Sequence, residues 1–147
     1  MKNIFKLMGI ALIASSMAFV SCGSDDDETY TINVQFGDKS WSSNDMSADI
    51  EEDMINASIF EGDANQASVT FKCPAKDGSH LFATEGNYAR YYENDDATAI
   101  VSNQTGFITI ESIDVAAHTI TGIVSSEMGE LNSGEKLTVT MTNANWK

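Results

Sequence analysis

The run Lys136-Leu137-Thr138-Val139-Thr140-Met141-Thr142 decides the fold class of this chain. Its apolar residues occupy every second position, and threonines fill the positions between them. Successive side chains of a β-strand point to opposite faces, so this alternation predicts a strand with one face in a core and the other in water. Threonine on the wet face is ordinary strand chemistry.

Two further β-rich runs precede this one, at 107–114 and 119–126. The segment Val115-Ala116-Ala117-His118 between them is short enough for a tight hairpin connection. The stretch 129–135, which contains Gly134, predicts a looser turn before the final run. Together the three runs predict an antiparallel meander.

The N-terminal half follows the same period of two. Tyr30, Ile32, Val34 and Phe36 fall on one face of a first strand, and Gly37-Asp38-Lys39 predicts a turn that leads back towards Trp41 in a hairpin. Further alternation indicates strands at 55–59 and 69–73, which are bounded by turn residues at 62–63 and 74–78. The segment from Ser47 to Met54 reads as a short helical turn.

About eight short strands with turn signals at this spacing predict an all-β fold. The expected architecture is a single antiparallel β-sandwich over residues 29–147, with an open β-barrel as the alternative. A chain of 147 residues fits one such domain.

The charge of the chain is strongly negative. It has 8 lysines and arginines against 22 acidic residues, a formal net charge of −14. Nucleic acid requires a basic surface, and an anionic membrane face repels negative charge, so neither is an expected partner of the domain.

Residues 1–21 have the anatomy of a removable export signal. Lys2 and Lys6 give a positive start, an apolar segment follows at 7–20, and Phe19-Val20-Ser21-Cys22 forms a cleavage box. This pattern predicts a bacterial lipoprotein signal with lipidation at Cys22, which would anchor the protein to the membrane. Removal of the signal would leave 126 residues and, with two lysines and no acids lost, would change the net charge from −14 to −16.

Two other interpretations of this segment are a plain secretory signal and a transmembrane helix. A membrane span needs about 20 apolar residues, whereas serines interrupt this segment and acids follow it closely.

Residues 22–28 are predicted to form an acidic tether behind the anchor. After Gly23 come Ser24, Asp25, Asp26, Asp27 and Glu28. This run resembles the acidic export signal of surface lipoproteins in Bacteroidota-type bacteria. The resemblance implies a protein in the outer membrane that faces the cell exterior. The alternative is an ordinary solvated spacer, because runs of like charge stay extended in water.

The C-terminal part of the chain resembles small Bacteroidota-type lipoproteins of uncharacterised function. The similarity lies in the segments 106–110, 119–124 and 138–146, together with the early turn Gly37-Asp38-Lys39-Ser40-Trp41. Those proteins end in an "I-x-G-x-F … V-x-I-T-N-G-x-F" pattern, from which this chain departs at Val124, Met141, Ala144 and Trp146. The resemblance implies an architecture and a cellular address, and no catalytic residues.

The residues most suggestive of binding are aromatic. Trp41 stands in the early hairpin, and Tyr88, Tyr91 and Tyr92 lie close together after Gly86. Such rings can stack on sugars or anchor a protein partner. Strand alternation places Tyr91 on the opposite face from Tyr88 and Tyr92, so one of the two sets is expected to face the core.

Candidates for catalysis and metal binding are few. His80 and His118 lie 38 positions apart without zinc-ligand spacing and are expected to be surface residues. Cys73 alternates with apolar residues and is expected to be buried and inert. Asp95 and Asp96, like the acids at 51–53, are weak calcium candidates because neither group follows the spacing of a calcium loop.

These observations favour a non-enzymatic lipoprotein of the outer membrane, displayed at the cell surface, that binds a glycan or a protein and needs no cofactor. One alternative is a structural or accessory subunit of a larger outer-membrane complex. A minor alternative is a small hydrolase that uses acidic residues, since two carboxylates can hydrolyse a glycosidic bond.

Overall fold

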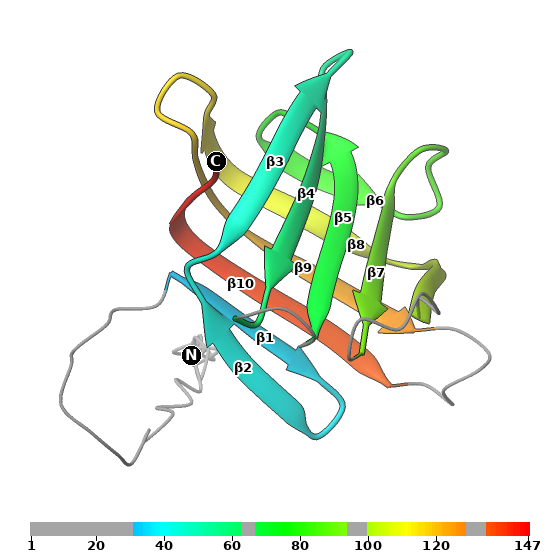
Figure 1. Cartoon of the computed structure of the whole chain (residues 1–147). Helices are drawn as coiled ribbons and strands as arrows, with labels where there is room; N and C mark the ends of the chain where they lie inside the picture. The colour runs from blue at the N-terminus through cyan, green and yellow to red at the C-terminus, as the bar shows by residue number, and fades with distance from the viewer. Residues whose placement is uncertain (1–30, 63–66, 94–99, 129–134) are drawn as a thin grey trace, which may run out of the picture.

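The part of the chain that the structure describes forms ten β-strands in two antiparallel sheets (Figure 1). The structure is a computed structural model that describes residues 31–62, 67–93, 100–128 and 135–147, and these ranges contain no helix. The strands are β1 (Ile32–Phe36), β2 (Lys39–Ser43), β3 (Met46–Glu51), β4 (Met54–Phe60), β5 (Ser68–Pro74), β6 (Gly78–Leu81), β7 (Tyr88–Tyr92), β8 (Ile100–Asp114), β9 (Thr119–Met128) and β10 (Lys136–Asn145).

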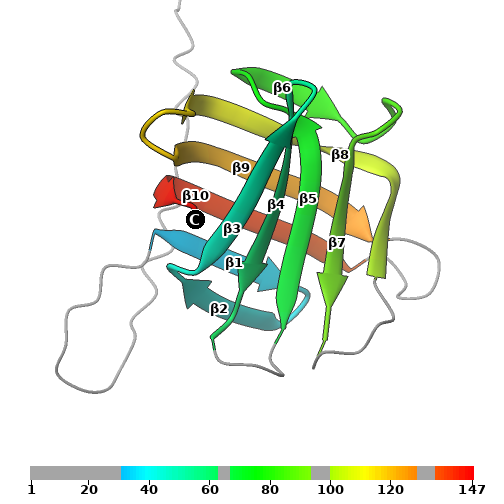
Figure 2. The same ribbon diagram turned by 45° about the horizontal axis from the view of Figure 1, so that its top comes forward.

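The first sheet, here called sheet A, has the order β2-β1-β10-β9-β8, and β6 pairs with the outer side of β8. The second sheet, sheet B, has the order β3-β4-β5-β7 and continues into the start of β8. Figures 1 and 2 show sheet B lying across sheet A as a second layer, with its strands at a steep angle to those behind them. The expected β-sandwich is therefore confirmed.

β8 belongs to both sheets because it bends. Its first residues, Ile100 and Val101, pair with β7, whereas the stretch from Gly106 onward pairs with β9. The register to β9 shifts between Ser102 and Gly106, and Gly106 has a φ of +126°, which favours glycine. A Cβ on Gly106 would lie 2.3 Å from the carbonyl oxygen of Ser125, so only glycine fits this crossing.

The core lies between the layers and is built from the alternate residues of both sheets. Sheet A contributes Ile32, Val34, Phe36, Ile108, Ile110, Ile120, Val124, Leu137, Val139 and Met141, and sheet B contributes Met46, Ile55, Ala57, Ile59, Val69, Phe71, Cys73, Ala89 and Tyr91. All of these side chains are buried, as alternation predicted for the strands other than β3, which was not recognised in the sequence. Their burial is the main stabilising contribution to a fold of this kind.

The C-terminal residues tie the two layers together at one edge. Lys147 forms backbone hydrogen bonds with Met46 and Ala48, the first residues of the edge strand β3. Trp146 is buried, and its backbone N–H donates to the carbonyl of His118 in the β8–β9 turn.

One local prediction is wrong. The segment from Ser47 to Met54 is not a helical turn, because it contains most of β3 and a two-residue hairpin turn at Glu52 and Asp53. Both turn residues have positive φ, 50° and 62°, which matches the twist that a hairpin of this length requires. Glycine or asparagine usually occupies such positions, and neither residue type is present here to signal the turn.

Candidate functional site

A cavity of about 380 Å³ opens at the end of the sandwich where β2 approaches the ends of β4 and β7. It is partly open to solvent. Its lining residues are Lys39, Ser40, Trp41, Glu61, Ala67, Tyr91 and Glu93. This end cavity brings together two of the four aromatic residues singled out in the sequence, Trp41 and Tyr91.

The β1–β2 hairpin delivers Lys39 and Trp41 to the end cavity. Lys39 pairs with Phe36 and Trp41 pairs with Val34 across the hairpin. Directly opposed residues share a face of a sheet, so the two side chains lie on the same side as the buried residues of β1. Gly37 permits the tight connection with its φ of +57°.

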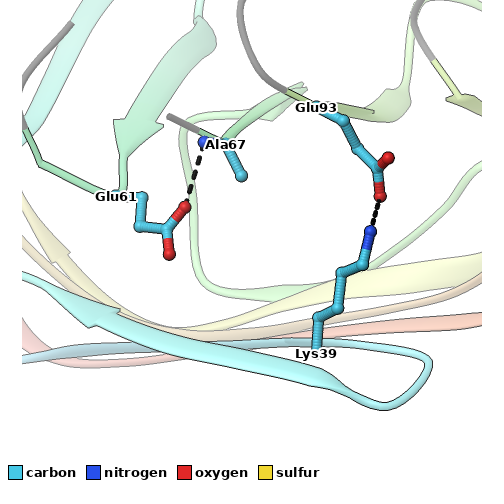
Figure 3. A network of polar contacts seen from close by, with 4 residues as sticks. All are labelled: Lys39, Glu61, Ala67 and Glu93. Atoms are coloured by element: carbon cyan, nitrogen blue, oxygen red, sulfur yellow. Dashed lines mark hydrogen bonds and ion pairs between the residues drawn. The ribbon is translucent and has the colours of Figure 1, made fainter. Parts of the chain in front are cut away.

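The end of β7 supplies an acidic partner for Lys39. The ammonium group of Lys39 forms an ion pair and hydrogen bond with Oε1 of Glu93, which follows Tyr92 directly (Figure 3). The hydrogen bond that Lys39 donates to Glu93, more than any other interaction, raises the pKa of Lys39 above its usual value. Both side chains are exposed, by 55% and 39%, so this pair adds little stability and holds its groups in place at the rim of the cavity.

A second acid, Glu61, lies across the end cavity from this ion pair (Figure 3). Its Oε2 accepts a hydrogen bond of 3.0 Å from the backbone N–H of Ala67, and the backbone N–H of Glu61 donates to the carbonyl of Ala67 at 3.0 Å. These contacts join the end of β4 to the start of β5. They fix the carboxylate relative to the sheet.

The aromatic wall consists of Trp41 and Tyr91. Tyr91 is buried and stacks on Phe36, with ring centroids 4.2 Å apart. Burial raises the pKa of Tyr91, and the nearby indole N–H of Trp41 opposes that rise. This approach lacks the geometry of a hydrogen bond, and the buried Nε1 of Trp41 has no hydrogen-bond partner among the described residues.

The end cavity therefore combines an indole with an unpaired donor, two fixed carboxylates and an ammonium group. The contacts described above use one oxygen of each carboxylate, and the described part of the chain supplies no donor to the other. Carboxylate oxygens accept hydrogen bonds from hydroxyl groups, and an aromatic ring offers an apolar face to the C–H side of a sugar ring. These groups of the end cavity are complementary to a small polar ligand that has one apolar face.

Tyr88 and Tyr92 lie elsewhere, on the outer face of sheet B. The hydroxyl of Tyr88 donates to Oδ1 of Asn56 at 3.1 Å, and the guanidinium of Arg90 lies 4.4 Å above the Tyr88 ring. The four aromatic residues thus do not form one cluster. Strand alternation predicted that either Tyr91 or the pair Tyr88 and Tyr92 faces the core. In the structure it is Tyr91.

Several residues named in the sequence analysis lie outside the described residues. They are Cys22, Ser24, Asp25, Asp26, Asp27, Glu28, Asp95 and Asp96. The acids at 51–53 are described and exposed in the β3–β4 hairpin. Among the described residues, no three potential ligands converge on a metal position.

The degree of burial that was predicted for Cys73 and the two histidines is observed for Cys73 and His118 and not for His80. Cys73 is fully buried, so the prediction of a buried thiol is confirmed, and burial raises its pKa to about 12. The prediction of a surface residue is wrong for His80, because β6 is a strand that turns the ring inward, where Nε2 lies 2.9 Å from the carbonyl of Lys76. His118 is exposed and stacks on Trp146.

Three residues of the end cavity, Lys39, Glu61 and Glu93, were not predicted as site residues from the sequence. Each stands at the end of a strand, next to an aromatic residue or one position removed from it. That position is a usable signal, since the ends of sandwich strands meet at one edge, but it does not by itself say which ends meet.

No helix in the described ranges is long and apolar enough to cross a membrane. Comparisons with protein-family models, with curated proteins and with solved structures found no match to this chain.

Proposed function

We propose that this protein is an outer-membrane lipoprotein, displayed at the cell surface, whose β-sandwich binds an extracellular saccharide in the end cavity without transforming it. The proposed address rests on the signal at 1–21, on Cys22 and on the acidic run at 24–28. The proposed binding activity rests on the end cavity, and above all on the unpaired indole N–H of Trp41 beside two fixed carboxylates.

The size of the end cavity favours a saccharide over a protein. Small-molecule sites span roughly 300–1,000 Å³, and about 380 Å³ lies in the lower part of this range. Protein interfaces instead need hundreds of Å² of exposed surface on each partner. A monosaccharide or the end of a glycan chain suits both the volume and the mixture of aromatic and carboxylate groups.

The engagement of both acids favours binding over hydrolysis. Glu93 is paired with Lys39, and Glu61 is held by the backbone of Ala67. A general acid must present a proton to the leaving group, whereas each of these carboxylates already accepts a hydrogen bond from the protein and is oriented by it.

Two edge strands, β2 and β3, do not favour assembly by strand addition. The edge strand β2 is short and polar and begins with a lysine, and β3 carries Asp49 and Glu51 and is partly covered by the backbone of Lys147. These features are typical of edges protected against pairing with another chain. The accessory-subunit alternative therefore has less structural support than ligand binding.

The test uses Trp41 as its own reporter. The chain has two tryptophans, so Trp146→Phe leaves the emission of Trp41 alone. The full-length chain in detergent is titrated with neutral hexoses, pentoses and their disaccharides. The expected result is a saturable change in emission together with a higher unfolding midpoint, since a ligand that binds only the folded state stabilises it.

Trp41→Leu and Glu93→Gln are expected to abolish the rise in midpoint, whereas Tyr88→Phe, which changes an aromatic residue outside the end cavity, is expected to retain it. A rise that persists in Trp41→Leu, or no response to any sugar of the panel, contradicts a saccharide site in this cavity.

A further inference from the structure

The outer face of sheet B carries the second set of aromatic residues among polar and basic side chains. Three rows run across β4, β5 and β7 in register. They are Asn56–Lys72–Tyr88, Ser58–Thr70–Arg90 and Phe60–Ser68–Tyr92. All nine positions are partly or fully exposed, and the residues between them along each strand are buried. We call this surface the outer basic face.

The charge of the outer basic face is opposite to that of the protein. It contains Lys72 and Arg90 and no acid, in a chain with a formal net charge of −14. The edge strand β3 of sheet B is acidic. Its Asp49 pairs with Asn56 of β4 and lies two strands away from Lys72, so their backbones are about 10 Å apart by strand spacing. Neither Lys72 nor Arg90 forms an ion pair with any residue that the structure describes.

The two cations are close enough to act on one group. Lys72 pairs directly with Tyr88, and Arg90 lies two residues further along the same strand, so the cations are diagonal neighbours. Diagonal Cβ atoms lie roughly 7–8 Å apart, within reach of long side chains. Like charges at this separation repel each other, and an anion between them relieves the repulsion.

Arg90 is held in place and incompletely paired. Its guanidinium lies over the Tyr88 ring, and that ring is fixed by the hydrogen bond to Asn56. Its Nε is buried without a hydrogen-bond partner among the described residues. A buried N–H that has no hydrogen-bond acceptor destabilises the folded protein. An oxyanion bound by the guanidinium would provide that acceptor.

We propose that the outer basic face binds the acidic group of a polysaccharide, a carboxylate or a sulfate ester, between Lys72 and Arg90. The neighbouring Tyr92 and Phe60, which is 39% exposed, offer apolar rings to adjacent sugar units. Two cations are too few for nucleic acid, which needs a basic stripe that follows its phosphates. This site lies on the opposite side of sheet B from the core and is independent of the end cavity.

The test measures binding of the full-length chain, in detergent, to immobilised polygalacturonate, dextran sulfate and neutral dextran over a range of salt concentrations. The comparison is made in the Trp41→Leu variant, in which the proposed saccharide site of the end cavity is lost. There, binding to one or both polyanions and not to dextran is expected, and it should weaken with salt. Tighter binding to polygalacturonate would indicate a carboxylate ligand, and tighter binding to dextran sulfate would indicate a sulfate ligand. Equal binding to neutral dextran would overturn the proposal.

The variant Lys72→Gln with Arg90→Gln is expected to weaken polyanion binding by about tenfold or more, the loss of at least one charge-assisted hydrogen bond. The matched control, Lys76→Gln with Lys136→Gln, removes the same charge from other exposed positions and should bind as the parent does. Equal weakening in both would indicate diffuse attraction and overturn the site. Thermal unfolding of each variant verifies that it is folded.

Three further comparisons make the assignment specific. Arg90→Lys keeps the charge and removes the planar guanidinium, so it is expected to weaken binding as well, and full retention would overturn the role given to Arg90. Phosphatidylglycerol vesicles are the remaining probe, and binding to them that is tighter than to either polyanion and lost in the Lys72/Arg90 variant would assign the face to a membrane instead. Trp41→Leu should leave polyanion binding unchanged, which separates this site from the end cavity.

Discussion

The ring of Tyr91 on β7 stacks on the ring of Phe36 on β1, with centroids 4.2 Å apart and planes inclined by 20°. The contact joins sheet B to sheet A directly beside the end cavity. Tyr91 is 1% exposed and Phe36 is 3% exposed, so both rings are part of the core. The hydroxyl of Tyr91 and the indole of Trp41 therefore sit on a rigid base.

Replacement of Tyr91 tests this structural role. Tyr91→Ala removes the stack and leaves a cavity, so the free energy of unfolding is expected to fall by about 3–5 kcal/mol. Tyr91→Phe keeps the ring and should cost about 1 kcal/mol or less. Urea unfolding followed by circular dichroism measures both. A loss in Tyr91→Ala no larger than in Tyr91→Phe contradicts a core role for the ring.

The strands that could be predicted from sequence are those whose alternation is strict. β1, β4, β5 and most of β10 have apolar residues at every second position, and each was expected close to its observed place. β9 was also expected, as a β-rich run, although Gly122 and Ser126 interrupt its alternation. β3 was missed because its inward residues after Met46 are only half-buried and its turn, Glu52-Asp53, contains neither glycine nor asparagine. β6 was missed because it has four residues and an exposed leucine.

The candidate site was predictable only in part. Alternation along β7 correctly separated Tyr91 from Tyr88 and Tyr92, because the side-chain period of a strand does not depend on the fold. That Trp41 meets Tyr91 depends on how sheet B crosses sheet A, since the strands that carry them are far apart in the strand order. Glu61 and Glu93 reach the end cavity through the same crossing, and no local pattern encodes it.

Glycine at position 106 is expected to be essential for the bend of β8. Gly106→Ala places a Cβ 2.3 Å from the carbonyl oxygen of Ser125 at a φ of +126°. Gly78 offers a matched control, since its φ of +127° imposes similar strain while a Cβ would meet nothing within 4 Å. The Gly106 variant should therefore lose roughly 1–3 kcal/mol more than Gly78→Ala. Thermal unfolding of the two variants side by side measures the difference, and equal losses would mean that steric contact with Ser125 is unimportant.

The lipid anchor is tested by Cys22→Ala. This change removes the only proposed acylation site, so metabolic labelling with palmitate should disappear and the protein should leave the membrane fraction. Cys73→Ala is the control, since it alters the buried thiol and should keep both the label and the membrane association. Persistent membrane association of Cys22→Ala contradicts the anchor.

Surface display is tested by changing Asp25, Asp26, Asp27 and Glu28 to alanine. If this run directs export, the protein should remain acylated but become resistant to protease added to intact cells. The control replaces four exposed acids of the domain, Asp77, Glu85, Glu111 and Glu127, which produces the same change in net charge. Unchanged protease accessibility in the first variant would reduce the acidic run to a spacer.

The buried thiol of Cys73 should make the protein less stable at alkaline pH. Burial raises its pKa from 9.0 to about 12. Between these values the unfolded chain releases the proton and the folded chain retains it, so the unfolded state binds fewer protons. The free energy of unfolding then falls as pH rises, by up to about 1.4 kcal/mol per pH unit, and the contribution of this thiol is flat below pH 9.

Urea unfolding at several pH values between 7 and 10.5, in a Cys22→Ala background, measures this slope for the parent and for Cys73→Val. The valine variant shifts the stability at every pH by its altered packing, yet it should lose the part of the decline that begins at pH 9. Tyr91, whose pKa is also raised by burial, contributes a further decline above pH 10 in both proteins, so the comparison isolates the thiol. Parallel curves for the two proteins over the whole range would mean that the Cys73 proton is not held more tightly in the folded state.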